Sequence, residues 1–239
     1  MAAELVPIRL SLTAGDRYTL WAPRWRDAGD EWEAFLGKGE DLYGFESVAD
    51  LVAFVRSDTD NDLVDHPAWK DLTQANAHTL DPADDKQFDL VGVEELVAEK
   101  PTEESVAALA GSLAIVASIG SVCELPTVNK FFNGNPMLGT VAGGIDHFTG
   151  RAGRKRWNSI AEIIARGWDD VLAAIDGIVS TPDVDGPRRR GQPTSWLSHA
   201  RTTTRSRPWT STSVPRSTSR KNPLRPTTAW CWAAMRTSG

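Results

Sequence analysis

Cysteine and histidine are scarce in this 239-residue sequence, which has two cysteines, Cys123 and Cys231, and four histidines. Two cysteines 108 positions apart do not provide a disulfide framework, and they do not have the spacing of a zinc site. We therefore predict no bound metal and no cofactor, and we expect the fold to be held together by its apolar core.

Long uninterrupted apolar runs are also missing. The first ten residues, MAAELVPIRL, contain neither a basic start nor an apolar run long enough for a signal peptide. The most apolar stretch, residues 106–122, is interrupted by glycine and serine, so we do not expect it to cross a membrane. The sequence predicts a cytoplasmic protein without a membrane partner.

Acidic residues are absent from the last part of the chain. Residues 1–185 contain 15 basic and 32 acidic residues, a net charge of −17, whereas residues 186–239 contain 11 basic and no acidic residues. An acidic body argues against general binding to duplex DNA, which requires the neutralisation of phosphates by Lys and Arg.

The basic segment, residues 186–239, also lacks Phe, Tyr and Ile, and its four tryptophans occur without periodicity. Such a segment cannot bury enough apolar surface to offset the entropy of ordering its backbone. When GC-rich codons for it are read in a shifted frame, they give an acidic sequence like that of the body. We interpret residues 186–239 as a disordered tail, the product of a frameshift near residues 185–187.

Residues 1–180 have the pattern of an α+β fold, a small antiparallel sheet with packed helices. Residues 5–13 alternate apolar and polar side chains, as a half-buried strand does, and a turn at Gly15 leads into a second strand over residues 17–22. Further strands are predicted at residues 32–36 and 42–45. A helix follows, with Ser47 as its N-cap.

The second half of the body is predicted to be helical. A proline and two acidic residues begin a helix at residues 101–104 that runs to about Cys123. A short helix is predicted at residues 127–132, and the strongest helical periodicity covers residues 153–179. We expect residues 1–100 to form a sheet–helix unit and residues 101–180 to form a helical part packed on it.

Aromatic and basic residues alternate in the first half of the chain and predict an interaction surface. A row of tryptophans and arginines can stack on bases or on a peptide. The alternative is that the tryptophans fill a small core while the arginine stems cover their rings. The residues concerned are Arg17, Trp21, Arg24, Trp25, Arg26 and Trp32.

A second candidate site is the basic run Arg151, Arg154, Lys155 and Arg156, which lies at the start of the helix predicted over residues 153–179. The helix dipole disfavours cations at this end. These side chains therefore either pair with the acidic body or contact an anion from outside the domain.

No catalytic site is predicted, because no catalytic constellation assembles along the sequence. Cys123 has no base partner that the sequence can place beside it. Asp146 and His147 have no accompanying nucleophile, and the glycine-containing segment 133–144 lacks the Gly-Lys-Ser/Thr ending of a phosphate loop.

Four runs of this sequence resemble a family of high-GC actinobacterial proteins labelled "primosomal protein". The runs are LVPIRLSLTAGDRYTLWAPRWRDAGDEWEAFLG, DLVDHPAW, FDLVGVEELVAEKP and FTGRAGRKRW. The resemblance covers residues 1–185. It implies a role in replication or restart, and it brings no catalytic residues with it.

Three functions follow as hypotheses. The first is a non-enzymatic, cytoplasmic protein-interaction module with an unknown protein partner. The alternative is a replication- or primosome-associated protein that binds single-stranded DNA or a replication partner. The second alternative is a small-molecule enzyme that uses Asp146, His147 and the glycine-containing segment.

Overall fold

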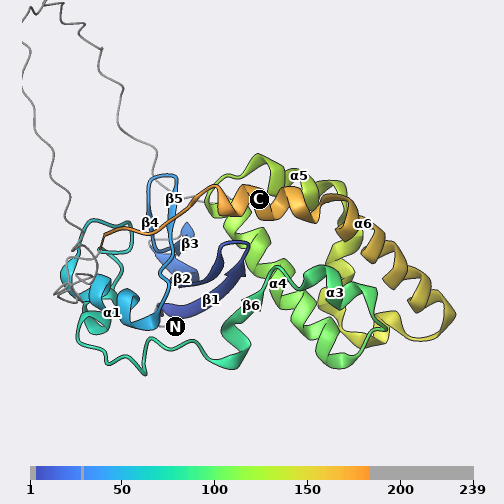
Figure 1. Cartoon of the computed structure of the whole chain (residues 1–239), viewed down its shortest axis with the longest axis horizontal. Coiled ribbons are helices and arrows are strands. Elements are labelled where there is room, and N and C mark those ends of the chain that lie inside the picture. The colour runs from blue at the N-terminus through green and yellow to red at the C-terminus, as the bar shows by residue number, and fades with distance from the viewer. Residues whose placement is uncertain (1–3, 28–29, 184–239) are drawn as a thin grey trace, which may run out of the picture. The chain divides into compact units, whose positions relative to one another are not determined.

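The computed structural model describes residues 4–27 and 30–183, with side-chain positions outside residues 25–31. All of these residues belong to one compact unit (Figure 1). Residues 186–239 lie outside the described part of the chain, so the tail's disorder and its frameshift origin stay predictions.

The main sheet has four strands in the order β3-β2-β1-β6. Strands β1 (Val6–Leu12) and β2 (Gly15–Asp27) form the predicted hairpin, in which Leu12 is opposite Gly15. Gly15 has a φ of 104°, which a glycine adopts without strain. Strand β3 (Asp30–Phe35) pairs antiparallel with β2, and β6 (Gln87–Asp89) pairs parallel with β1.

A smaller, three-stranded sheet has the order β4-β5-β7. Strands β4 (Gly37–Lys38) and β5 (Asp41–Tyr43) form a tight hairpin, and β7 (Val179–Ser180) runs parallel to β5. The Leu42 amide donates to the Ile178 carbonyl at 2.8 Å, and the Gly44 amide donates to the Ser180 carbonyl at 2.9 Å. These bonds join the end of the described chain to its first third.

The main sheet is buried on both faces, because each face contributes side chains to a different apolar cluster. We call the cluster on one face the helical core; it contains Ile8, Leu10 and Leu12 together with residues from the helices between residues 93 and 176. We call the cluster on the other face the small core; it contains Leu20 and Ala22 together with residues from the helices between residues 48 and 73.

Two short helices and their connections complete the small core. Helix α1 (Val48–Ser57) begins at the predicted N-cap, where the Ser47 hydroxyl accepts from the Asp50 amide at 3.2 Å. Helix α2 (Trp69–Thr73) adds Trp69 and Leu72 to the same cluster. A single 3₁₀ turn, η1 (Asp84–Lys86), then leads the chain into β6.

The helical core is built by six consecutive segments. They are α3 (Val93–Ala98), α4 (Glu103–Val122), α5 (Pro126–Gly134), η2 (Pro136–Gly143), η3 (Ile145–Phe148) and α6 (Gly150–Asp176). Thr102 and Ser105 form a capping box at the start of α4, where each side chain bonds the other residue's amide. On α6, the fully buried Trp168 donates its indole N–H to the Leu90 carbonyl at 2.8 Å.

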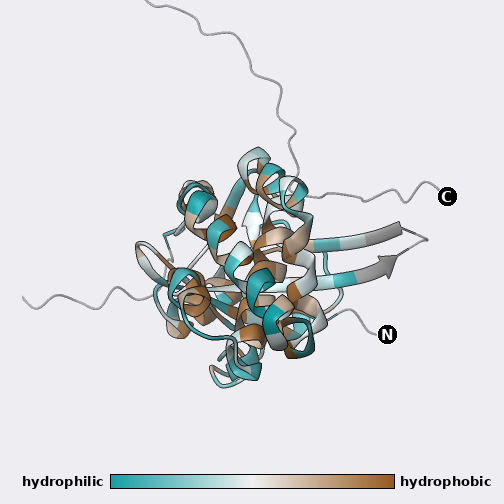
Figure 2. Cartoon of the chain, turned by 90° about the vertical axis from the view of Figure 1, so that its right-hand side faces the viewer, coloured by the Kyte–Doolittle hydropathy of each residue, from teal (hydrophilic) through white to brown (hydrophobic). Residues whose placement is uncertain are grey.

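Helix α4 is the one helix of the described chain that is long and apolar enough to span a membrane. Half of its most apolar window is buried against the rest of the domain. The core helix of a folded domain has these properties, and Figure 2 shows apolar residues gathered among the packed helices.

The α+β fold class predicted from the sequence is confirmed. The sheets are mixed and not purely antiparallel, because β6 and β7 each join a strand in the parallel direction. Both are only two or three residues long and pair with strands that precede them by more than seventy residues. Local periodicity cannot reveal such pairings.

Candidate functional site

Helix α4 carries small residues along the part of its surface that the cores do not cover. Ala107 and Ala114 are exposed, and Ala110 and Ala117 are half-buried. A stripe of alanines leaves the helix backbone accessible, because no long side chain stands above it.

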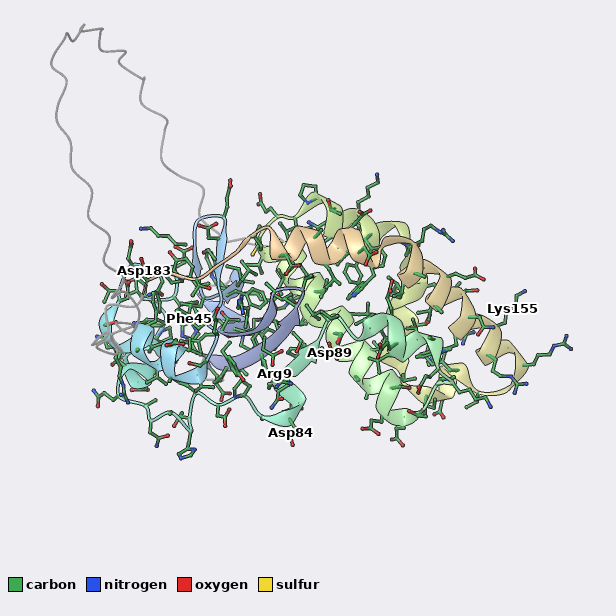
Figure 3. The ribbon with its side chains drawn as sticks, in the orientation of Figure 1. Arg9, Phe45, Asp84, Asp89, Lys155 and Asp183 are labelled. Carbon is green, nitrogen blue, oxygen red and sulfur yellow. The ribbon has the colours of Figure 1, made fainter. Side chains whose placement is uncertain are left out.

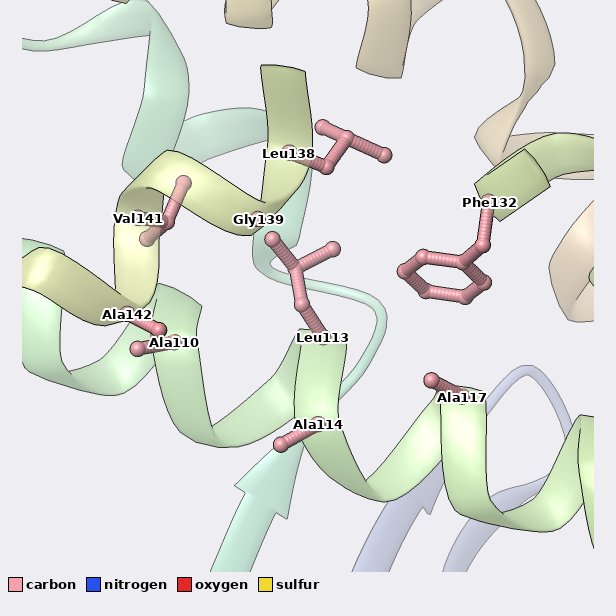
Figure 4. Close-up of a pocket in the computed structure, with 9 residues that line it drawn as sticks. All are labelled: Ala110, Leu113, Ala114, Ala117, Phe132, Leu138, Gly139, Val141 and Ala142. Atoms are coloured by element: carbon pink, nitrogen blue, oxygen red, sulfur yellow. The ribbon is translucent and has the colours of Figure 1, made fainter. Parts of the chain in front are cut away.

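A groove follows this stripe, with α4 as its floor and with η2 and one side chain of α5 as its walls (Figure 4). It encloses about 190 Å³ and is open to the surface. We call it the α4 groove. Its lining consists of Ala110, Leu113, Ala114, Ala117, Phe132, Leu138, Gly139, Val141 and Ala142.

The residues at the two ends of η2 explain where this wall of the groove begins and ends. Pro136 begins the 3₁₀ segment, and Gly144, with a φ of 79°, ends it. Leu138 and Val141 anchor η2 in the helical core, whereas Met137 is 39% exposed. The wall is therefore fixed by two buried side chains and carries an apolar side chain at the surface.

The chemistry of the α4 groove is uniform. None of its nine lining residues carries a charged or polar side chain. Such a site offers no proton donor, base or nucleophile, and it gains free energy only from burial of apolar surface. Its volume is comparable to a cavity of 150 Å³ that binds benzene, so it suits one aromatic or branched aliphatic side chain.

The structure places Trp21 and Arg24 together with a carboxylate that the sequence analysis did not single out. The Trp21 indole donates to Glu33 Oε1 at 3.0 Å, and Arg24 Nε donates to Glu33 Oε2 at 3.3 Å. Trp21 also stacks on Phe35, with ring centroids 6.3 Å apart, and packs against the helical core. Both its hydrogen bond and its packing are therefore internal.

The structure describes only part of the remaining predicted Trp/Arg surface. Arg17 donates to the carbonyls of Ala14 and Asp16 in the β1–β2 turn. Trp25 and Trp32 are opposite each other in the register of β2 and β3. The side chains of Trp25 and Arg26 lie outside the described positions, so a continuous surface of these six residues stays a prediction.

The basic run lies at the start of α6, as predicted. Arg151, Arg154 and Lys155 are exposed, and Figure 3 shows Lys155 pointing away from the helices that surround α6. Arg156 donates to the His147 carbonyl. Within residues 4–27 and 30–183, no ion pair involves Arg151, Arg154 or Lys155.

The residues considered for catalysis do not converge on a pocket. His147 is exposed, its ring lies against the backbone of Gly143, and the adjacent Asp146 is exposed as well. Cys123 is half-buried at the C-cap of α4. Among the described residues, no group of three or more His, Cys, Asp or Glu has the geometry to hold a metal ion.

A cluster of titratable groups lies where the loop after α1 meets the β4–β5 hairpin. Lys38 pairs with Asp60, and this hydrogen bond raises the pKa of Lys38. The Gly39 amide donates to Asp62 Oδ2 at 3.1 Å, and burial raises the pKa of Asp62. These bonds hold the loop against the hairpin. The cluster therefore has a structural role, which explains why these titratable groups lie together.

A wider and more polar cleft runs between α5 and α6. It encloses about 820 Å³, is lined by Lys130, Asp170 and Asn135 together with small residues, and is open along its length. Phe131 and Gly167 also line the cleft, and a side chain at position 167 would press on the Phe131 ring. Lys130 and Asp170 both lie at its walls, and these two described residues form no ion pair with each other.

The α4 groove is not predicted from the sequence. Residues 133–144 are visible there only as a candidate phosphate loop that lacks the required ending. The alanines of α4 can also be read from the sequence, but only the folded position of η2 beside them makes a groove.

The fold and the groove define a class of protein: an α+β domain with an apolar core on each face of its main sheet and an open apolar site on one core helix. The chain belongs to the SatS C-terminal domain family, whose family model matches residues 5–176.

A solved structure, "The crystal structure of SatS c-terminal domain in complex with bromine", has a similar fold. The TM-score is 0.54 and the identity is 20%, over 74% of this chain and 94% of that chain. At this identity the likeness shows the fold alone. No curated protein matches this chain.

The resemblance to proteins labelled "primosomal protein" is wrong. Both the family match and the solved structure point to the SatS C-terminal domain. The quoted runs form structural elements, such as the β1–β2 hairpin and α3, and they contain core residues such as Ile8 and Val93. The replication role that depended on the label therefore has no support.

Proposed function

We propose that this domain is a non-enzymatic protein-interaction module and that the α4 groove seats an apolar side chain of a partner polypeptide. The observation that carries this proposal is the composition of the groove: nine lining residues, all apolar, of which four are on α4 and three of those are alanine.

Burial of apolar surface supplies the free energy of such binding. Each Å² of apolar surface removed from water contributes about 25 cal/mol, so a fully buried Leu or Phe side chain contributes about 1.5–3 kcal/mol. One side chain in the groove is therefore an anchor, and the partner needs further contacts along α4 to reach micromolar affinity.

The rigidity of the groove supports the proposal. Leu113, Leu138 and Val141 are all less than 6% exposed and belong to the helical core, so the floor and one wall are fixed before a partner arrives. A preformed apolar site avoids the entropy cost of ordering its walls on binding.

A matched pair of alanine substitutions tests the proposal on the full chain. Ala114→Glu places a carboxylate in the groove, whereas Ala108→Glu places one on the same helix outside the lining. The probe is an amphipathic peptide of about 14 residues, long enough for four helical turns, with leucines on one face and glutamines on the other.

Fluorescence anisotropy measures the affinity of the labelled peptide. We expect Ala114→Glu to weaken binding at least about tenfold, because an unpaired charge in an apolar site is costly, and Ala108→Glu to leave it unchanged. Equal affinity of both variants and the wild type would contradict the assignment of the groove as the binding site.

A further inference from the structure

The start of helix α6 carries a local positive charge. We call Arg151, Arg154 and Lys155 the basic end. In the described part of the chain these three side chains have no ion-pair partner, although residues 1–185 contain 32 acidic residues. The acidic residues that do form ion pairs belong to other parts of the domain.

Helix α6 itself disfavours this charge. The basic end occupies its first two turns, where the helix dipole is positive, and the first turn contains no acidic residue. The side chain of its N-cap, Thr149, makes no capping bond. The sequence left two interpretations open: pairing within the domain and contact with an external anion. Among the described residues, these three side chains form no internal ion pair, so their surroundings favour contact with an external anion.

The basic end and the α4 groove belong to one continuous piece of structure. Segment η2 forms the groove wall, η3 follows directly, and Phe148 of η3 packs edge-on against Trp157 of α6 with ring centroids 5.1 Å apart. Arg156 also bonds the His147 carbonyl of η3. The wall and the basic end are therefore fixed relative to each other.

The separation between the two features suits one short segment of a partner. Arg151 follows Ala142, in the groove, by nine positions, so the two residues lie at most about 32 Å apart. The backbone turns at Gly144 and Gly150, which both have positive φ, so the actual separation is shorter. A segment of about 14 residues is about 21 Å long as an α-helix and up to about 46 Å long when extended, which covers this range.

From these observations we infer that the partner is an amphipathic protein segment whose apolar face enters the α4 groove and whose acidic residues contact the basic end. This inference rests on the proposed function, since it specifies the chemistry of the segment that the groove binds. The apolar anchor supplies affinity, and the charge contacts select among apolar segments and orient them.

An acidic protein segment suits this domain better than an anionic membrane or nucleic acid does. A membrane surface or a nucleic acid carries negative charge over a wide area. It would therefore also face the rest of residues 1–185, whose net charge of −17 repels it. A short acidic segment contacts only the basic end, where the local charge is positive.

The test compares two peptides of about 14 residues that share the same leucine face. One carries glutamates on the side that faces the basic end, and the other carries glutamines. On the full chain at about 50 mM salt, we expect the glutamate peptide to bind about tenfold more tightly, because exposed charge pairs are weak individually and add over three contacts. At about 500 mM salt the preference should largely disappear.

Two double charge reversals serve as matched variants. Arg154→Glu with Lys155→Glu changes the basic end, and Lys70→Glu with Arg166→Glu changes the net charge by the same amount at exposed positions elsewhere. We expect the first variant to lose the preference for the glutamate peptide and the second to keep it.

The outcomes separate this inference from the proposed function. If both peptides bind equally and neither reversal matters, the inference is overturned while groove binding stands. If Ala114→Glu has no effect on either peptide, both are overturned. Binding to vesicles of equal parts phosphatidylglycerol and phosphatidylcholine that depends on the basic end, without a peptide preference, would assign the basic end to a lipid surface and overturn the inference.

Discussion

The burial of His66 makes the free energy of unfolding depend on pH. It is 3% exposed, its Nδ1 accepts from the Ala68 amide at 3.2 Å, and burial lowers its pKa below the ordinary value of 6.5. Below pH 6.5 the unfolded chain takes up a proton more readily than the folded domain does. Stability therefore falls as the pH falls below 6.5, until the folded state also binds the proton.

We predict that His66→Asn removes this part of the pH dependence. The asparagine oxygen can accept from the Ala68 amide in place of Nδ1, and asparagine does not titrate. Urea unfolding at several pH values between about 5 and 7 should show a smaller slope for this variant than for the wild type. The exposed His78→Asn is the matched control, and an equal loss of slope in that variant would contradict the assignment to His66.

Trp168 is the largest side chain that is fully buried, and it joins two distant parts of the chain. We predict that Trp168→Phe lowers the free energy of unfolding by about 2–4 kcal/mol, because the Leu90 carbonyl loses its donor and part of the ring volume becomes a cavity. Urea unfolding measures the loss. Arg166→Gln, an exposed substitution on the same helix, should change stability by less than about 0.5 kcal/mol.

At the scale of secondary-structure elements, the junction of η3 with α6 depends on a glycine. Gly153 lies in the first turn of α6, and a Cβ there would overlap the backbone of Phe148. The helix propensity of alanine favours Gly153→Ala by about 1 kcal/mol. The clash opposes it, and because the obstacle is backbone rather than a flexible side chain, we expect the clash to dominate.

We therefore predict that Gly153→Ala lowers the melting temperature and loosens the link between the groove wall and the basic end. Gly134→Ala, at the end of α5, is the control, because a Cβ there meets nothing within 4 Å. Thermal unfolding should show a loss of about 1–3 kcal/mol for the first variant and no loss for the second. A stabilised Gly153→Ala would show that the junction can shift to accept a side chain.

The sequence predicts elements well where one local signal determines them. The capping residue Ser47, the acidic first turn at Glu103 and Glu104, the hairpin turn at Gly15 and the periodicity of α6 all lie within a few residues of the element that they define. Helix α6 begins at Gly150 and ends at Asp176, so the predicted end at residue 179 was too late. Val179 and Ser180 form β7, because hydrogen bonds to β5 replace the next helical turn.

The candidate site was less predictable, for a physical reason. The basic run at residues 151–156 is visible in the sequence, but whether it has partners depends on which acidic residues the fold brings near it. The groove depends on η2, whose Pro136 and Gly144 indicate turns and not a wall. Trp21 and Arg24 illustrate the same limit, since their shared contact with Glu33 arises from the pairing of β2 with β3.

At the scale of the whole molecule, the described members of both cores lie between residues 5 and 179. Strand β7 attaches the end of that range to β5. Thr181 adds a bond from its hydroxyl to the Gly44 carbonyl at 2.7 Å. The residues required for stability are therefore expected to end near residue 183.

Two truncations test this boundary. A chain ending at residue 185 keeps both cores and β7, so we predict a melting temperature equal to or above that of the full chain. A chain ending at residue 177 loses the backbone bonds from Leu42 and Gly44 and the Thr181 bond. At about 1 kcal/mol each, these three bonds correspond to a fall of about 6–12 °C for a domain of this size. If the chain ending at residue 185 instead melts several degrees below the full chain, residues 186–239 contribute to the fold, and their interpretation as a frameshift product is wrong.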